Sequence, residues 1–285
     1  MPVSTWAIAE PQKLTFDEPV TALSVRIVNG TVNIVGTDEP TARLEVTGIE
    51  GPPLIVTQKD GVLTVTYEDL AWQGLLKWFD SKGWHRHAAV SLAVPAGSTV
   101  EVGVVGAGAF VSGIRGRTAV RGVNGDTTLV GLAGPVGAET VSGNVEAQAV
   151  TGDLRFHSVS GDLTVVEGAG ASVRAESVSG NMVLDLNPNG KPTDIRLTTV
   201  SGEVAIRLPH PADAKVEANT ASGSVSNGFE DLRVNGQWGA KRITGTLGSG
   251  TGTLRAKTVS GSIALLRRPP AEDDAHDAEP TGKVL

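Results

Sequence analysis

Acidic side chains recur at equivalent positions in the second half of the chain and are the first candidates for chemistry. They directly follow glycines and are Asp126, Asp153, Asp162 and Glu203. If these carboxylates stacked above one another, they would form a ladder of the oxygen ligands that Ca²⁺ prefers. Other copies of the position carry Asn144, Asn181, Ser224 and Ser262. Since Asp and Asn also serve local hydrogen bonding in turns, we favour that role and predict no metal site.

Histidines and a glycine-rich stretch offer weaker sites. His85 and His87 could clip a metal only if a carboxylate joined them, and the histidines show no typical zinc spacing. Residues 248–252 lack the Lys-Ser/Thr pair and the helix that follow a phosphate-binding loop. We therefore predict no catalytic residue, no cofactor and no enzyme. A carbohydrate-active site built across neighbouring strands is the alternative, because the sequence alone does not reveal such a cluster.

These side chains belong to a four-residue phrase: Val or Ala, then Ser, Thr or Asn, then Gly, then a polar residue. Its glycines are Gly125, Gly143, Gly152, Gly161, Gly180, Gly202, Gly223 and Gly261. A looser copy is Ile243-Thr244-Gly245-Thr246. A unit of about ten residues, or twice that, is therefore being stacked, and each unit relies on its neighbours to bury its apolar face.

The phrase leads into alternating residues, which are typical of half-buried strands. In one copy, Val159, Gly161, Leu163 and Val165 share one parity, so we expect the valine and the glycine to face inward. A glycine inside a strand marks a bend, a bulge or the close approach of another backbone. The prediction is an all-β fold: an elongated β-solenoid, or a stacked sheet of short strands.

The N-terminal half contains the same kind of strands in a less regular order. Asp60-Gly61 predicts a hairpin between residues 55–57 and 63–66. We expect residues 1–104 to form an irregular N-terminal β unit, because terminal repeats are usually atypical. Residues 105–268 would continue it as the repeat region, and the Pro-rich acidic residues 269–285 would form a disordered tail.

An aromatic insertion interrupts the strands at residues 70–87. Its candidate docking or capping residues lie on or beside one face of a short helix or loop: Trp72, Leu75, Leu76, Trp78, Phe79 and Trp84. One interpretation is a cap over an open end of the sheet stack. Another is docking to a membrane surface or a partner, because cationic residues accompany the aromatic ones.

The recurrent Val-Ser-Gly-Asp/Asn phrase resembles the bacterial putative-adhesin family of β-strand-repeat proteins, the DUF4097 group. Residues 95–98, which read Pro-Ala-Gly-Ser, and the strand residues after them support the resemblance, which extends over residues 20–266. Membership implies a β-solenoid-like sheet stack and supplies no catalytic residues. Domains of this kind are also discussed as sensory or assembly modules near bacterial membranes.

The net charge and the targeting signals restrict the expected partners and the expected location of the protein. The net charge of −7 argues against nucleic acid as the main partner. The N-terminal residues lack a signal-peptide pattern and no apolar run is long enough to span a membrane, so we expect a cytoplasmic protein, with peripheral contact at the inner membrane as the alternative.

The first hypothesis for function is a non-enzymatic scaffold that binds a protein or envelope-associated partner. Self-association through strand edges would be a further use of such a stack. The alternatives are a membrane-surface sensor or assembly module that docks through the aromatic segment, and a carbohydrate-active β-helix enzyme.

Overall fold

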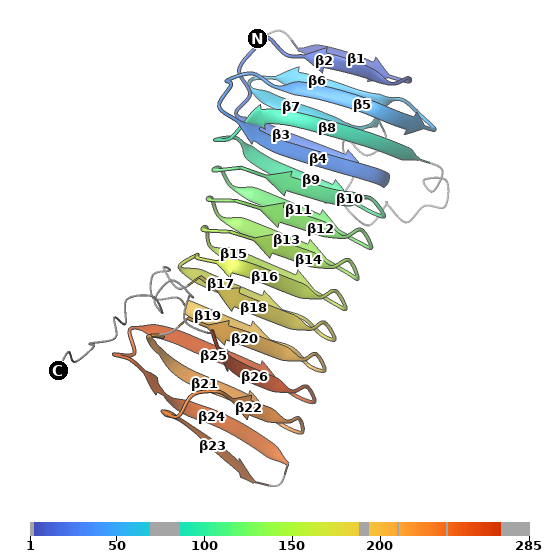
Figure 1. Cartoon of the computed structure of the whole chain (residues 1–285). Coiled ribbons are helices and arrows are strands. Elements are labelled where there is room, and N and C mark those ends of the chain that lie inside the picture. Colours follow the sequence, from blue (N-terminus) through green and yellow to red (C-terminus); the bar gives the residue numbers. More distant parts are fainter. Residues whose placement is uncertain (1–2, 69–85, 188–193, 210, 238, 269–285) are drawn as a thin grey trace, which may run out of the picture.

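The computed structural model describes residues 3–68, 86–187, 194–209, 211–237 and 239–268. These residues form two long sheets that lie face to face, with their strands stacked along one axis (Figure 1). No α-helix occurs in the described ranges. The predicted β-solenoid is therefore confirmed.

Within the described residues, one sheet has 14 strands and the other has 12. In hydrogen-bonded order, the larger sheet, sheet A, contains β1 (Ser4–Ile8), β6 (Leu54–Lys59), β7 (Val62–Tyr67), β3 (Ala22–Ile27), β9 (Thr99–Val104), β11 (Thr118–Gly122), β13 (Val136–Thr140), β15 (Leu154–Ser158), β17 (Ser172–Glu176), β19 (Asp194–Thr198), β25 (Gly252–Thr258), β21 (Ala214–Thr220), β24 (Ala240–Leu247) and β23 (Leu232–Gln237). Sheet B contains β2 (Gln12–Thr15), β5 (Arg43–Glu50), β8 (His87–Pro95), β4 (Asn29–Thr37), β10 (Gly108–Ser112), β12 (Thr127–Val130), β14 (Val145–Gln148), β16 (Leu163–Gly168), β18 (Met182–Leu186), β20 (Val204–Leu208), β26 (Ile263–Arg267) and β22 (Val225–Asn227).

One rung of the solenoid consists of a strand in sheet A, a corner, a strand in sheet B and a second corner. Val136 pairs with Leu154 in sheet A, and Val145 pairs with Leu163 in sheet B, both in parallel register. The longer of the two predicted periods is thus the rung, and the shorter one is half of it. Because half of a regular rung contains an odd number of residues, the inward-facing positions change between even and odd residue numbers from one strand to the next.

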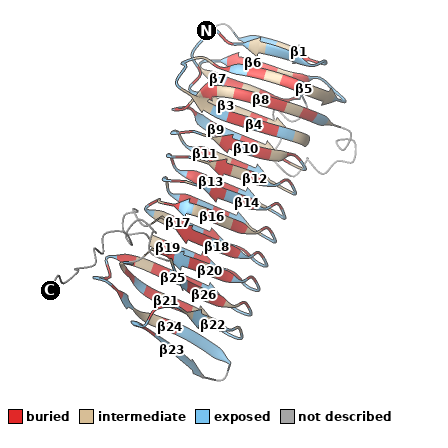
Figure 2. Ribbon diagram, viewed as in Figure 1, coloured by how far each residue is buried: buried red, intermediate tan, exposed pale blue. Residues whose placement is uncertain are grey.

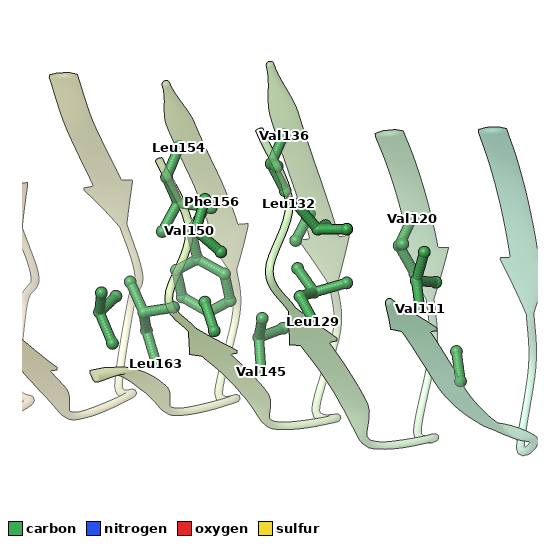
Figure 3. Packing of buried hydrophobic residues seen from close by; sticks show 14 of the residues in the cluster. Val111, Val120, Leu129, Leu132, Val136, Val145, Val150, Leu154, Phe156 and Leu163 are labelled. Carbon is green, nitrogen blue, oxygen red and sulfur yellow. The ribbon is translucent and has the colours of Figure 1, made fainter. Parts of the chain in front are cut away.

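The core is a narrow layer of aliphatic side chains between the two sheets. Phe156 and Leu154 come from sheet A and Leu163 from sheet B, and all three are buried. Figure 2 shows the alternation of buried and exposed residues along the strands, and Figure 3 shows the side chains meeting between the sheets. Alternating Val and Leu produce this arrangement because successive strand residues point to opposite faces.

Antiparallel strands end both sheets at the N-terminal end of the stack and sheet A at the C-terminal end. At the N-terminal end, β1 pairs with β6 and β2 with β5, and the Trp6 and Phe16 rings meet edge to face at 5.4 Å. The hairpin predicted at Asp60-Gly61 joins β6 to β7, and both turn residues have positive φ (51° and 77°). At the C-terminal end, the hairpin β23–β24 covers β21, while β25 and β26 form a rung inside the stack. The last described strands in chain order, β25 and β26, therefore have hydrogen-bonded neighbours on both sides, and β23 and β22 are the edge strands at this end.

Two details of the repeat prediction were wrong. The looser copy at Gly245 lies in the middle of the antiparallel strand β24 and forms no corner, because there it pairs with β21 and β23. The valine of the phrase does not face inward in most copies. Val159 is 51% exposed although Gly161 is buried, because the chain turns at this point and has not yet entered the strand.

Two predicted segments lie outside the described residues. They are most of the aromatic insertion, up to residue 85, and the tail at residues 269–285. Within the described part, no helix is long and apolar enough to cross a membrane.

Candidate interaction surface

The corner that leads from sheet A to sheet B has one repeated design, which the residues around Val159 illustrate. The Gly161 N–H donates to Ser158 Oγ at 2.7 Å, which closes the turn. The Ser160 hydroxyl donates to the Val141 carbonyl of the preceding rung at 3.2 Å. The Asp162 N–H donates to Asn144 Oδ1 at 3.1 Å. The corner's polar groups therefore bind the rungs to one another, and the valine is left pointing outward.

The glycine of this corner is required by close stacking of the backbone. A Cβ on Gly161 would lie 2.1 Å from the Gly143 carbonyl oxygen, and one on Gly180 would lie 2.0 Å from the Gly161 oxygen. Such distances are sterically forbidden, so only glycine allows rungs to approach at strand spacing here. The close approach of another backbone, one of the predicted reasons for the glycine, is the correct one.

The position after the glycine forms a mixed ladder of Asp, Asn and Glu, and its Asp and Asn side chains make the local hydrogen bonds that the sequence analysis favoured over an acidic ladder. Asp126 accepts from the Asn144 N–H at 2.9 Å, and Asp162 accepts from the Asn181 N–H at 2.7 Å. In the same column, Asn181 accepts from the Glu203 N–H at 2.9 Å. Asp153 lies at the opposite corner. No group of metal-ligating side chains is found in the described part of the chain.

Exposed valines line up along the corner from sheet A to sheet B, which is the first corner of each rung. This valine row comprises Val105, Val123, Val141, Val159, Val178, Val200 and Val259. The last five are 44–52% exposed. With neighbouring strands about 4.8 Å apart, the row is about 29 Å long. The hydrogen bonds that hold the corner come from the backbone and from Ser, Asp and Asn side chains, and none comes from the valine side chains.

The second corner, from sheet B to sheet A, buries its hydrophobic residue. Its first residue takes a positive φ at Gly131 (62°) and Ala149 (51°). This backbone turn directs the next side chain inward, and Leu132 and Val150 are almost fully buried. The copy of the phrase at Val150 thus belongs to this second corner. The two corners of one rung differ in that only the first exposes its valine.

A groove of about 540 Å³ runs beside the valine row on the sheet A side. Its apolar wall comes from Val105, Val123, Val141 and Val159, and its polar wall comes from Arg121, Glu139 and His157. Arg121 and Glu139 form an ion pair at 3.3 Å, and His157 Nδ1 lies 3.6 Å from Glu176. An apolar strip with a rim of paired charges has the composition of a protein-binding surface.

A second linear feature lies on the outer face of sheet A. This arginine row comprises Arg155, Arg174, Arg196 and Arg255, which are directly paired in register on β15, β17, β19 and β25. All four side chains are exposed. Each arginine stands four residues before the valine of its phrase, so an alignment of the repeats would have shown that the arginines share a position. The sequence analysis missed both the arginine row and the outward direction of the valines.

The predicted docking residues Trp72, Leu75, Leu76, Trp78, Phe79 and Trp84 lie outside the described residues. Of the two candidate metal-clip histidines, only His87 is described, as the first residue of β8. The glycine-rich residues 248–252 form a turn held by Asp213, which accepts from the Thr251 hydroxyl and N–H and from Ser249. Hydrogen bonds from Thr251 and Ser249 lower the Asp213 pKa to about 2.

The stacked rungs and ordered corners define a β-solenoid repeat protein. The model of the Toastrack DUF4097 family matches residues 184–266, which confirms the predicted resemblance to that family over this part of the chain. No curated protein matches the chain.

Three crystal structures are similar over most of the chain. A putative cell adhesion protein from Clostridium sporogenes ATCC 15579 is 11% identical, with 91% of this chain and 100% of that chain covered and a TM-score of 0.26. A putative lipid binding protein from Parabacteroides distasonis ATCC 8503 is 9% identical, with 92% and 98% covered and a TM-score of 0.44. A putative adhesin from Parabacteroides merdae ATCC 43184 is 10% identical, with 94% and 96% covered and a TM-score of 0.27.

Proposed function

We propose that the chain is a non-enzymatic scaffold that binds a protein or envelope-associated partner along the valine row and the groove beside it. The observation that carries the proposal is the contrast between the two corners. The second corner buries its hydrophobic residue, whereas the first exposes a valine in five successive rungs of the stack. Apolar side chains lined up in this way on an exposed edge favour burial against another molecule.

The exposed area of the row sets how much it can contribute to a contact. Each of the five exposed valines retains about half of its surface in water. Covering that remainder would stabilise a complex by about 1 kcal/mol per valine, or about 5 kcal/mol in all, before the cost of association. The length of the row suits an extended segment or a helix of the partner, and the paired charges of the groove would form the polar rim.

The two alternative functions find less support. The carbohydrate-active enzyme requires a carboxyl group with a raised pKa. Hydrogen bonding instead lowers the pKa values of Asp194 and Asp213. Docking of the aromatic insertion to a membrane concerns residues outside the described part, and it stays a prediction.

Affinity capture with matched variants tests the proposal. The full-length chain would be immobilised and incubated with the protein and envelope fractions of its source cells. We expect Val159→Lys combined with Val178→Lys to lose a retained partner. Val183→Lys should keep that partner, since Val183 is equally exposed, at 45%, but lies on sheet B. Retention by the double variant, or loss with Val183→Lys, would contradict the assignment of the surface.

A further inference from the structure

We propose that the arginine row binds a linear anionic polysaccharide. This surface adjoins the groove beside the valine row at Glu139, but the inference does not depend on the protein partner proposed above. Four guanidinium groups stand in direct register on adjacent parallel strands. At about 4.8 Å per strand they form a straight line about 14 Å long.

Stability alone does not explain the row. Like charges directly opposite one another on neighbouring strands are destabilising. The nearby acids offset this only in part, since Arg174 lies 3.7 Å from Asp194 and Arg255 lies 4.0 Å from Glu217. The repulsion between stacked guanidinium groups would be relieved by an external anion. Guanidinium forks bind carboxylate, sulfate and phosphate groups in a bidentate manner.

Acidic residues on both sides of the row restrict the shape of that anion. Two residues further along the strands, Glu139 and Glu176 lie in one column with His157, Thr198 and the cationic Lys257. Two residues before the arginines, Asp153 in the corner and Asp194 on β19 lie with Ser172 and Thr253. A flat anionic membrane would bring its charges against these acids as well as against the arginines. A narrow anionic chain that lies along the arginines is attracted by them and keeps its charges away from most of the flanking acids.

The same flanking residues select a chain that also carries hydroxyl groups. Carboxylates such as Asp194 and Glu176 accept hydrogen bonds from hydroxyl donors, and Thr198 can donate as well as accept. A sugar polymer offers such donors between its acidic groups. Polyphosphate has none, so it would leave these acceptors without donors.

Two other linear polyanions fit less well. The outward residues of β15, β17, β19 and β25 include no Phe, Tyr or Trp on which a nucleic-acid base could stack. An extended acidic peptide presents side chains on one face about every 6.7 Å, which is out of step with the rungs. The charges and hydroxyls on this face therefore favour an acidic polysaccharide.

Binding measurements with defined polymers test this inference on the full-length protein. Polygalacturonate and dextran sulfate are the anionic probes in calorimetric titrations at low salt, and uncharged dextran is the control. We expect both anionic polymers to bind, with an affinity that falls as salt rises, and dextran not to bind. Binding of dextran at equal strength, or no binding of either anionic polymer, would overturn the proposal.

Variants of equal charge separate the row from the overall charge of the protein. Arg174→Gln combined with Arg196→Gln should weaken binding about tenfold, from the loss of two charge-assisted contacts. The matched control, Arg43→Gln combined with Arg115→Gln, removes the same charge from exposed sites elsewhere and should change affinity less than about twofold. Arg174→Lys with Arg196→Lys keeps the charge, so its intermediate affinity would identify the guanidinium fork even if the Gln variant were unfolded.

Polyphosphate, oligo(dT) and vesicles containing phosphatidylglycerol complete the series. Weaker binding of all three than of polygalacturonate supports a polysaccharide ligand. Tighter binding of any of them, sensitive to the Arg174/Arg196 variant, would overturn the polysaccharide assignment. Equal affinities of the Arg174/Arg196 and Arg43/Arg115 variants would overturn the arginine row as the site.

Discussion

Replacing Gly161 with alanine tests whether glycine at the first corner sets the spacing of the rungs. The added Cβ would lie 2.1 Å from the Gly143 carbonyl oxygen, whereas real Cβ contacts stay above 3.0 Å. The backbones must therefore separate by about 0.9 Å. That shift would stretch the Ser160 N–H to Val141 carbonyl distance from 2.8 Å to about 3.7 Å, beyond hydrogen-bonding range.

The expected loss of stability follows from these contacts. Overpacking costs about 1–3 kcal/mol, and each weakened hydrogen bond between rungs adds about 1 kcal/mol. With two such bonds at the corner, from Ser160 and Asp162, Gly161→Ala should lower the free energy of unfolding by about 3–5 kcal/mol. The φ of Gly161 is not positive, so the cost is steric and not conformational.

Urea unfolding followed by circular dichroism measures this loss, and Gly137→Ala is the matched control. Gly137 lies on β13, and a Cβ there would have no atom within 4 Å. The control should therefore be neutral or more stable by up to about 1 kcal/mol, through lower entropy of the unfolded chain. Stability of Gly161→Ala within about 0.5 kcal/mol of the parent would refute the stacking argument, as would an equal loss in the control.

Three further predictions concern the corners and turns. Ala149 has φ of 51°, so Ala149→Gly should raise the free energy of unfolding by up to about 1 kcal/mol, and a lower melting temperature would contradict the assigned strain. The Asp213 pKa of about 2 lies below the ordinary 3.8, so its contribution to stability is present above pH 3.8 and is lost as the pH falls through 2. A carboxyl NMR titration should show this midpoint, and Thr251→Val should raise it; an unchanged midpoint would count against the hydrogen bond. Asp162→Ala removes the acceptor of the Asn181 N–H and should cost about 1 kcal/mol in thermal unfolding, whereas Asp162→Asn should cost less than half as much; equal losses would contradict the ladder.

The architecture could be predicted from the sequence because two features of the repeat indicate it. Alternation of apolar residues after each glycine gives the strands, and the recurrence of Gly161 and its equivalents gives the stacking. The Asp60-Gly61 hairpin was predictable for a local reason, since Asp-Gly is a frequent pair for a turn with two positive φ angles.

The direction of the valines could not be predicted from parity alone. Val159 and Gly161 share a parity, but parity has meaning only inside a strand, and this valine lies in a turn. Val150 has the same sequence context and is buried, because Ala149 before it takes a positive φ. The sign of φ at the residue before the valine therefore decides which corner exposes its valine. Only some copies carry a glycine at that residue, so the sequence does not always indicate the angle.

The arginine row was predictable in principle. Its members stand at one fixed distance before the valine of the phrase, but their alignment depends on which strands are neighbours. Arg196 and Arg255 are adjacent only because β25 lies between β19 and β21 in the sheet. Among the strands of sheet A, β21 follows β19 in sequence order, which would have placed Glu217 next to Arg196. Only the structure therefore shows that Arg255 is the last member of the row.

Site-specific photo-crosslinking in the source cells tests the central claim most directly. A photoreactive amino acid would replace Val141, Val159 and Val178 in turn, and Val183 on sheet B as the matched exposed position. The account predicts that the three positions of the valine row attach to the same partner and that Val183 does not. Crosslinks to that partner from Val183 alone, or equally from all four positions, would contradict the valine row as the binding surface of the scaffold.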